Sequence, residues 1–159
     1  WSILINKLCS KFPNHKFVII GAPNERKMGE TIVSKINNKE NLFNLIGQTE
    51  VNEVTHIIKK SKGYIGLDTG FMHLAAALNV PTFTLWGPSC KNSYGYELKD
   101  KSKNFCFSLD LQCSPCNSPI NPNLSRVNHF SSCPDYRCIK EIEVDQVFNT
   151  LKKFILGSS

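Results

Sequence analysis

A short stretch near the middle of the chain combines residue types that can bind an anion. It reads GLDTGFMH over residues 66–73, with an apolar run before it and an Ala-rich segment after it. We expect Asp68 to end a strand and Thr69 and Gly70 to open a helix, whose first N–H groups have no partner inside the helix. These N–H groups and the helix dipole favour a phosphate, Gly70 leaves the backbone open, and Thr69 adds a hydroxyl donor.

His73 follows Gly70 by three residues, about one helical turn, so its ring could stand beside the same anion. The ordinary alternative is structural. An Asp or Thr before a helix is most often an N-cap that contributes about 1 kcal/mol, and a single histidine is most often a surface residue or one already satisfied within the fold. The spacing alone leaves both interpretations open.

Short apolar runs alternate with helical patterns in front of and behind this stretch. The expected strands are residues 17–20, 42–46, 64–67 and 82–86, and the expected helices are residues 1–12, 25–36, 51–61 and 69–78. This order predicts an α/β fold: a Rossmann-like parallel sheet with helices on both faces. Ligands bind outside the carboxyl ends of the strands in such sheets, which is where Asp68 to Gly70 are expected.

The chain reads as a single domain, residues 1–159, in three parts. Residues 1–88 are expected to form the βαβ core. Residues 89–140 are expected to form a Cys-rich irregular segment, called the excursion below, with one strand at 105–111. Residues 141–156 are expected to form a C-terminal helix. Because the sequence lacks an initiator Met and opens within a helical pattern, we expect it to be a piece of a longer protein.

Composition argues against several classes of protein. Hydrophobic residues make up 41% and charged residues 20% of the 159 residues, which suits a globular domain rather than a disordered or fibrous one. The apolar stretches are too short to span a bilayer. The net charge of +6 allows attraction to anions, but it is carried by scattered Lys. Nucleic acid is therefore not an expected partner, since Arg, the usual base-reading residue, is scarce.

Four of the seven cysteines gather late in the chain, with two residues between Cys113 and Cys116 and four between Cys133 and Cys138. Two close pairs are suited to a structural Zn²⁺ site, in which His129 could replace one ligand. Free thiols and a disulfide remain alternatives. The odd number of cysteines and the missing export signal predict a reducing, cytoplasmic environment.

Residues 63–88, which read GYIGLDTGFMHLAAALNVPTFTLWGP, resemble the signature of glycosyltransferase family 9, the family of the ADP-heptose:lipopolysaccharide heptosyltransferases. The specific part is the pattern Asp-Thr-Gly-x-x-His-Leu with the Pro that follows the helix. Supporting segments occur in the same order as in the family: the strand ending at Gly21, Glu25-Arg26, residues 46–49 and the late cysteines. The resemblance therefore covers nearly the whole chain.

Such a resemblance implies a GT-B fold, in which two Rossmann-like domains face each other across a cleft. This chain resembles the C-terminal, donor-binding domain, and we expect the N-terminal acceptor domain to be absent from it. The residues implied to contact the diphosphate and sugar of the donor are Asp68, Thr69, Gly70 and His73. Glu25 matches an acidic residue that holds the donor nucleoside, although an acid in a first helical turn is also favoured for structural reasons. Gln48 and Thr49 are weaker candidates for donor binding.

The implied reaction moves a heptose or similar sugar, with inversion, from a nucleotide diphosphate sugar to a lipopolysaccharide or other surface glycan. The catalytic base would lie on the missing domain, so no catalytic residue is expected here and the fragment alone should be inactive. ADP-heptose is the best-known donor of the family, and no cofactor is required. The intact enzyme would work in the bacterial cytoplasm on the inner face of the inner membrane, where positive charge could help binding.

Two other functions stay open. One is a non-catalytic nucleotide-binding Rossmann domain, although no Gly-x-Gly-x-x-Gly follows the first strand as dinucleotide binding would require. The other is a zinc-stabilised interaction module, in which the cysteine cluster is the functional part and the α/β portion its scaffold.

Overall fold

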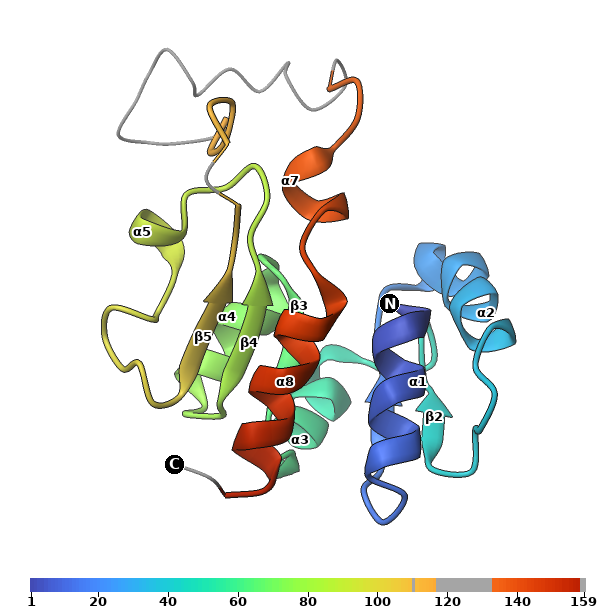
Figure 1. Cartoon of the computed structure of the whole chain (residues 1–159). Coiled ribbons are helices and arrows are strands. Elements are labelled where there is room, and N and C mark those ends of the chain that lie inside the picture. The colour runs from blue at the N-terminus through green and yellow to red at the C-terminus, as the bar shows by residue number, and fades with distance from the viewer. Residues whose placement is uncertain (110, 117–132, 158–159) are drawn as a thin grey trace. The chain divides into compact units, whose positions relative to one another are not determined.

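The computed structural model describes residues 1–109, 111–116 and 133–157 (Figure 1). It divides into two compact units, the first made of residues 1–57 and 144–159 and the second of residues 58–143. Helix α3 (Val51–Lys60) carries the chain from the first unit into the second. In the described part of the chain, no helix is both long and apolar enough to cross a membrane.

The first unit contains a parallel pair of strands. Strand β1 (Phe17–Ile19) pairs with β2 (Leu42–Asn44) in parallel, and the connection between them contains the 3₁₀ turn η1 (Pro23–Glu25) and helix α2 (Arg26–Ser34). A parallel pair joined through a helix is the βαβ arrangement that the alternating pattern predicted.

Helix α1 (Ser2–Lys11) packs against α8 (Val144–Ile155) within this unit. The buried apolar residues spaced four apart are Leu4 and Leu8 on α1 and Val147 and Leu151 on α8. This spacing places each pair on one face of its helix, so the two apolar faces can meet. The Nζ atom of Lys7 lies 2.8 Å from Asp145 Oδ1 at the edge of this contact.

The second unit contains a three-stranded parallel sheet in the order β3-β4-β5, with β3 at Tyr64–Leu67, β4 at Thr82–Leu85 and β5 at Asn104–Phe107. Helix α4 (Gly70–Ala77) joins β3 to β4 and lies behind the strands in Figure 1. Two single-turn helices, α5 (Lys91–Tyr94) and α7 (Arg137–Lys140), flank β5 in the sequence.

Strand β4 is the centre of this sheet, and the first three of its four residues are buried. Phe83 is fully buried and stacks on Phe105 of β5, with 4.7 Å between ring centroids. Thr82 is buried as well, and its hydroxyl donates to Asn104 Oδ1 at 2.9 Å, which satisfies the polar atom. A strand covered on both faces is expected at the middle of a parallel sheet.

The end of the helix predicted over residues 69–78 is confirmed, because Leu78 is the C-cap of α4. Asn79 adopts a left-handed backbone with φ 58°. Its N–H donates to Ala76 O at 3.0 Å, and the N–H of Val80 donates to Ala75 O at 2.9 Å. These two bonds satisfy the last carbonyls of α4 and form a Schellman motif, which turns the chain from α4 into β4.

The excursion of residues 89–140 holds more regular structure than expected, namely α5, β5 and α7. The strand predicted at 105–111 ends at Phe107, because β5 pairs in register with β4 and Phe107 lies opposite Leu85, the last residue of that strand. The helix predicted from residue 141 begins at Val144. His129 lies outside the described residues.

Candidate functional site

The turn after β3 places Asp68 and Thr69 at the carboxyl end of that strand. Thr69 is the N-cap of α4, with an extended backbone, and its carbonyl accepts the N–H of Met72 at 3.0 Å. Its side chain makes no capping hydrogen bond. The N-cap interpretation therefore fits the backbone of Thr69 but does not account for its hydroxyl.

Gly70 opens α4 and is exposed. A Cβ atom added at Gly70 would meet no other atom within 4 Å, so packing does not require a glycine. In the described part of the chain, the N–H groups of Gly70 and Phe71 have no acceptor. These N–H groups carry the partial positive charge of a helix N-terminus, which suits an anion.

His73 lies between two polar partners rather than standing alone. Its Nε2 atom lies 3.4 Å from Asp68 Oδ1, and its Nδ1 atom lies 3.2 Å from the hydroxyl oxygen of Tyr96. The Asp68 side chain is 18% exposed and the His73 side chain 41%. Because a carboxylate only accepts, Nε2 carries the proton toward Asp68, and the other ring nitrogen is left for the phenol.

Tyr96 is a residue of this site that the sequence did not indicate. It comes from the loop after α5, 23 residues beyond His73. The ammonium of Lys99 lies 5.1 Å from the centroid of the Tyr96 ring, a cation–π contact. Lys99 thus brings positive charge to the tyrosine that holds His73, which favours an anion nearby.

Tyr64 is a second residue that sequence reasoning missed. Its hydroxyl lies 3.5 Å from Thr69 Oγ1. The ring occupies the space where a side chain of Gly66 would stand, two residues along the same strand face. Gly66 therefore has a packing role: it allows the ring of Tyr64 to fold along β3 toward Thr69.

Glu25 belongs to the first unit, where its carboxylate closes the turn after β1. Its Oε2 atom accepts the N–H of Ala22 at 2.7 Å. A Cβ atom at Gly21 would lie 2.8 Å from the same oxygen, so the absence of a side chain at Gly21 makes room for the carboxylate. Glu25 is therefore not merely a solvated acid of a first turn.

Gln48 and Thr49 follow β2 in the first unit. The side-chain amide of Gln48 donates to Asn44 O at 2.9 Å and so helps to close the turn at the left-handed Gly47. The hydroxyl of Thr49 is buried and has no hydrogen-bond partner in the described structure. A buried hydroxyl without a partner is costly, which makes Thr49 the more informative of the two positions.

The four late cysteines are free thiols, of which Cys113 is exposed and the other three are half-buried. Burial raises the pKa of the Cys116 and Cys138 thiols. In the described residues, no three His, Cys, Asp or Glu side chains are gathered closely enough to form a ready-made metal site.

Parallel strands joined through helices define an α/β protein, and the helix start at the carboxyl end of β3 is of the kind that can bind a phosphate group. Residues 1–125 match the sequence model of glycosyltransferase family 9 (heptosyltransferase). The chain therefore belongs to glycosyltransferase family 9, as its resemblance predicted.

Individual relatives agree with this assignment. The chain is 32% identical to lipopolysaccharide heptosyltransferase 2 of Escherichia coli over 77 residues, which are 47% of this chain and 22% of that protein. It is 33% identical to lipooligosaccharide heptosyltransferase 2 of Haemophilus influenzae over 86 residues, 53% of this chain and 25% of that protein. The matched segments thus span about a quarter or less of the relatives' length.

Two solved structures share the fold. One is E. coli ADP-heptose LPS heptosyltransferase II, with a TM-score of 0.71 and 20% identity over 99% of this chain and 42% of that one. The other is a family 9 glycosyltransferase from Veillonella parvula, with a TM-score of 0.71 and 18% identity over the same shares. The predicted α/β fold class is confirmed.

Proposed function

We propose that this chain is the donor-binding domain of a glycosyltransferase, the C-terminal half of a GT-B enzyme. The observation that carries the proposal is the open start of α4. The N–H groups of Gly70 and Phe71 have no acceptor among the described residues, and the Thr69 hydroxyl makes no capping hydrogen bond. A Cβ atom added at Gly70 would meet no other atom within 4 Å, so a ligand can approach the backbone there. A nucleotide diphosphate sugar supplies the anion that these donors lack.

In this proposal the diphosphate sits on the N–H groups of Gly70 and Phe71 and on the Thr69 hydroxyl. The Asp68 carboxylate would repel a phosphate, so it serves instead as an acceptor for sugar hydroxyls and as the partner that orients His73. His73 lies one helical turn beyond Gly70, and in this proposal it contacts the donor by exchanging one of its two partners, Asp68 or Tyr96, for a donor oxygen.

The N–H groups and the Thr69 hydroxyl at the start of α4 would also act during sugar transfer, when the bond between the sugar and the diphosphate breaks. Negative charge then grows on the leaving phosphate, and fixed N–H groups at a helix start stabilise it without having to reorganise. A base on the acceptor domain would take the proton of the attacking sugar hydroxyl, which gives inversion in one displacement. This chain supplies leaving-group stabilisation and donor binding, and alone it would not transfer sugar.

Glu25 is proposed to contact the nucleoside part of the donor, and Gln48 and Thr49 are proposed as further donor-binding residues. A carboxylate can accept from two ribose hydroxyls at once, and the buried Thr49 hydroxyl offers a further polar group. ADP-heptose is the proposed donor, because a family 9 relative with a solved structure is an ADP-heptose enzyme.

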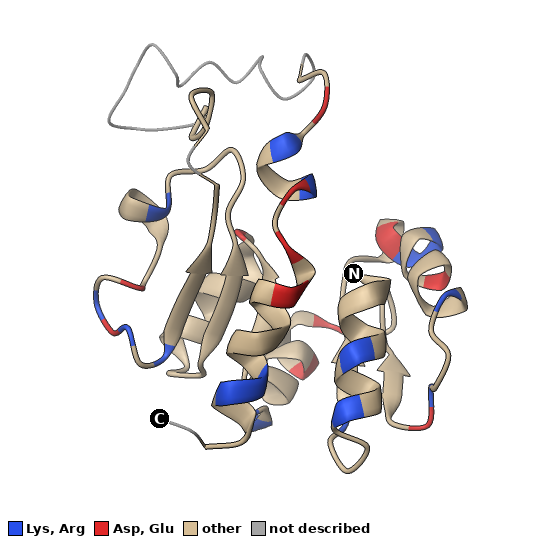
Figure 2. Cartoon of the chain, viewed as in Figure 1, with Lys and Arg blue, Asp and Glu red and all other residues tan. Residues whose placement is uncertain are grey.

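The acceptor is proposed to be a lipopolysaccharide or related surface glycan, bound through a domain outside this chain. The proposed location is the bacterial cytoplasm, at the inner face of the inner membrane. Figure 2 shows Lys and Arg on many elements of both units. Such dispersed charge suits weak attraction to anionic lipid better than a dedicated nucleic-acid surface.

The test is ligand-observed NMR of the chain with ADP, UDP, GDP and their sugar conjugates. Binding of one nucleotide series is expected, with weaker binding in Thr69→Val and His73→Ala. The matched controls are Thr31→Val and His56→Ala, two exposed residues that bond only to carbonyls of their own helices. Equal binding by the site variants and the controls would show that the donor does not use the start of α4.

A second experiment addresses the role of the chain in the whole enzyme. Heptose transfer to a lipopolysaccharide acceptor is expected from the full-length protein and not from residues 1–159. Transfer by the chain alone would contradict the proposed division of labour between the two domains.

A further inference from the structure

Both cysteine pairs are anchored on one turn of the second unit. The Ser114 hydroxyl, between Cys113 and Cys116, donates to the carbonyl of Gly87 at 2.7 Å. The other pair reaches the same glycine, because a Cβ atom added at Gly87 would lie 3.3 Å from Cys138 Sγ. Gly87 is buried and directly follows Trp86 at the carboxyl end of β4. Two segments far apart in sequence are thus held together at one point.

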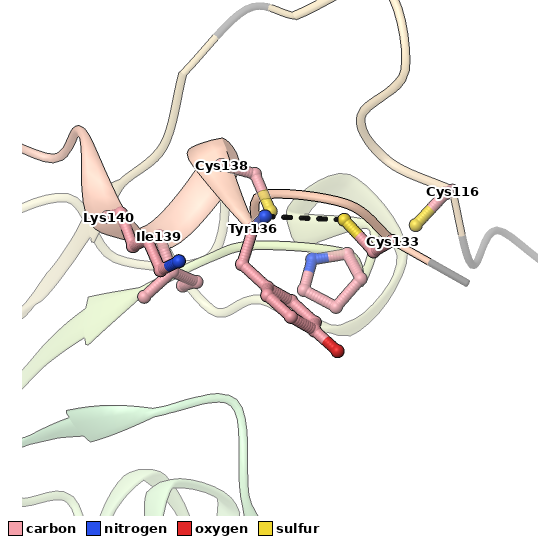
Figure 3. Close-up of a pocket in the computed structure, with 7 residues that line it drawn as sticks. Cys116, Cys133, Tyr136, Cys138, Ile139 and Lys140 are labelled. Carbon is pink, nitrogen blue, oxygen red and sulfur yellow. Dashed lines mark hydrogen bonds between the residues drawn. The ribbon is translucent and has the colours of Figure 1, made fainter. Parts of the chain in front are cut away.

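Three of the four thiols line a single cavity. Its lining consists of Pro88, Cys116, Cys133, Tyr136, Cys138, Ile139 and Lys140. Figure 3 shows the sulfur atoms of Cys116, Cys133 and Cys138 in a row along this cavity. The fourth thiol belongs to Cys113, the neighbour of Ser114, whose hydroxyl donates to the carbonyl of Gly87 beside Cys138. All four thiols therefore share one neighbourhood.

The turn between Cys133 and Cys138 is shaped to present an N–H group to sulfur. The N–H of Tyr136 donates to Cys133 Sγ at 3.4 Å, marked by the dashed line in Figure 3. Tyr136 reaches this position in a left-handed backbone, with φ 55° and ψ 35°, which is uncommon for a residue other than glycine. An N–H donor of this kind stabilises negative charge on a thiolate.

A cation stands near the thiols as well. Lys140 lines the cavity, and its ammonium lies 5.6 Å from the centroid of the Tyr136 ring. Four thiolates around a divalent ion leave two negative charges in excess, and Lys140 would offset part of them. Arg137, in the same turn, is already paired with Glu141, its Nε atom donating to Oε1 at 2.7 Å. A disulfide pair would need neither the N–H donor nor the cation, because its sulfur atoms carry no charge.

We propose that Cys113, Cys116, Cys133 and Cys138 bind one Zn²⁺ ion in a tetrahedral, structural site. Thiolate sulfur is the ligand that Zn²⁺ takes in closed four-coordinate sites. Binding forms four Zn–S bonds and releases the thiol protons to solvent, with no oxidant or reductant involved. Since no ready-made site exists among the described residues, the sulfurs close around the ion as it binds, which couples metal binding to local folding.

The ion is expected to stabilise the segments that carry the two cysteine pairs against the turn at Gly87 and Pro88. The Ser114 hydrogen bond already ties one segment to Gly87, and Cys138 of the other segment lies beside the same glycine; zinc would join the two segments through four Zn–S bonds. The site is separate from Asp68, Thr69 and Gly70, so its existence does not depend on the proposed donor binding.

Metal content tests the proposal directly. The chain is purified under reducing conditions, and bound metals are measured by inductively coupled plasma mass spectrometry. One zinc per chain is expected, falling to near zero in Cys116→Ser and Cys138→Ser. The matched control is Cys106→Ser, since Cys106 is also half-buried and in the second unit. Full zinc content in both site variants would overturn the proposal.

Cobalt substitution of the unmutated chain avoids any folding defect of the variants. Co²⁺ bound by four thiolates gives strong visible bands and thiolate-to-cobalt charge transfer in the near ultraviolet. These bands are expected at one equivalent and should disappear when Zn²⁺ is added. Absence of both zinc uptake and cobalt bands in the reduced chain would refute the site, as would an intact mass two hydrogens lower, which indicates a disulfide.

Discussion

The Nδ1 atom of His73 lies 3.2 Å from the hydroxyl oxygen of Tyr96, and the two rings meet edge to face with 5.7 Å between centroids. With Asp68 on the opposite nitrogen, the imidazole ring of His73 is held from both sides. A histidine held in this way has a defined ring orientation, so a change in either partner should be felt at the other.

Replacing Tyr96 by Phe removes the hydroxyl while keeping the ring. One hydrogen bond contributes about 0.5–1.5 kcal/mol, so donor affinity is expected to fall roughly 2- to 12-fold with little change in stability. Affinity is measured by NMR titration, and ¹⁵N shifts of the His73 ring report the altered partner. The control is Tyr94→Phe, at an exposed tyrosine of α5. If both variants bind equally well, Tyr96 does not position His73 for the donor.

Gly70→Ala separates binding from folding. The added methyl meets no protein atom within 4 Å, and Ala is the better helix former, so stability should stay equal or rise by up to about 1 kcal/mol. Donor binding should weaken about tenfold, because the methyl stands where the phosphate approaches the backbone. Thermal unfolding and NMR titration measure the two effects.

A second glycine provides the contrast for this prediction. Gly47 has φ +67°, a left-handed backbone that L side chains rarely adopt. Gly47→Ala should therefore lower stability by roughly 1–2 kcal/mol. If Gly70→Ala were as destabilising as Gly47→Ala, Gly70 would be structural and the proposed anion site would lose its main support.

Much of the fold could be predicted from the sequence, because local patterns encode it. The apolar run before Asp68 predicted a strand, which the structure contains as β3. The helix that follows was predicted to end at residue 78, and the left-handed Asn79 comes directly after that end. Strand ends were less accurate, since they depend on the partner: β5 ends at Phe107 because β4 offers no further residue to pair with. The sequence of one strand does not reveal how it will pair in register with the neighbouring strand, so it does not reveal where the pairing ends.

The candidate site could be predicted only where its residues are close in sequence. Asp68, Thr69, Gly70 and His73 lie within one strand–helix turn, so their spacing placed them together. Tyr96 reaches His73 from a loop 23 residues away, and no periodicity marks such a contact. The structural role of Glu25, which is to close the turn after β1, likewise could not be predicted without seeing its bond to Ala22.

The loop that carries Tyr96 is expected to depend on pH through Asp100. Two hydrogen bonds from Ser102, from its hydroxyl at 2.6 Å and its N–H at 2.9 Å, hold the pKa of the Asp100 carboxyl below its ordinary value. The N–H of Asp100 in turn donates to the carbonyl of Tyr96. A lowered pKa in the folded state means that this turn is stabilised above the ordinary carboxyl pKa. The stabilisation is lost as the pH falls through the lowered value.

Carboxyl ¹³C shifts of Asp100 followed against pH measure this directly. In Ser102→Ala the pKa should rise toward its ordinary value, because the hydroxyl bond is the largest cause of the shift. The Tyr96 ring signals should change with the same titration. An unchanged pKa in Ser102→Ala would show that the hydroxyl does not hold this carboxylate.

Glu25 allows turn closure and donor binding to be told apart by two substitutions. Glu25→Ala removes the acceptor of the Ala22 N–H and should lower stability by roughly 1 kcal/mol, whereas Glu25→Gln keeps an oxygen that can accept it. If the carboxylate also holds ribose hydroxyls, Glu25→Gln should bind the nucleotide several-fold more weakly while folding normally, since hydrogen bonds to an ionised acceptor are the stronger ones. Glu30→Gln, an exposed acid of α2, is the control for lost charge. Wild-type affinity in Glu25→Gln would limit Glu25 to closing the turn after β1 and would leave the nucleoside to other residues.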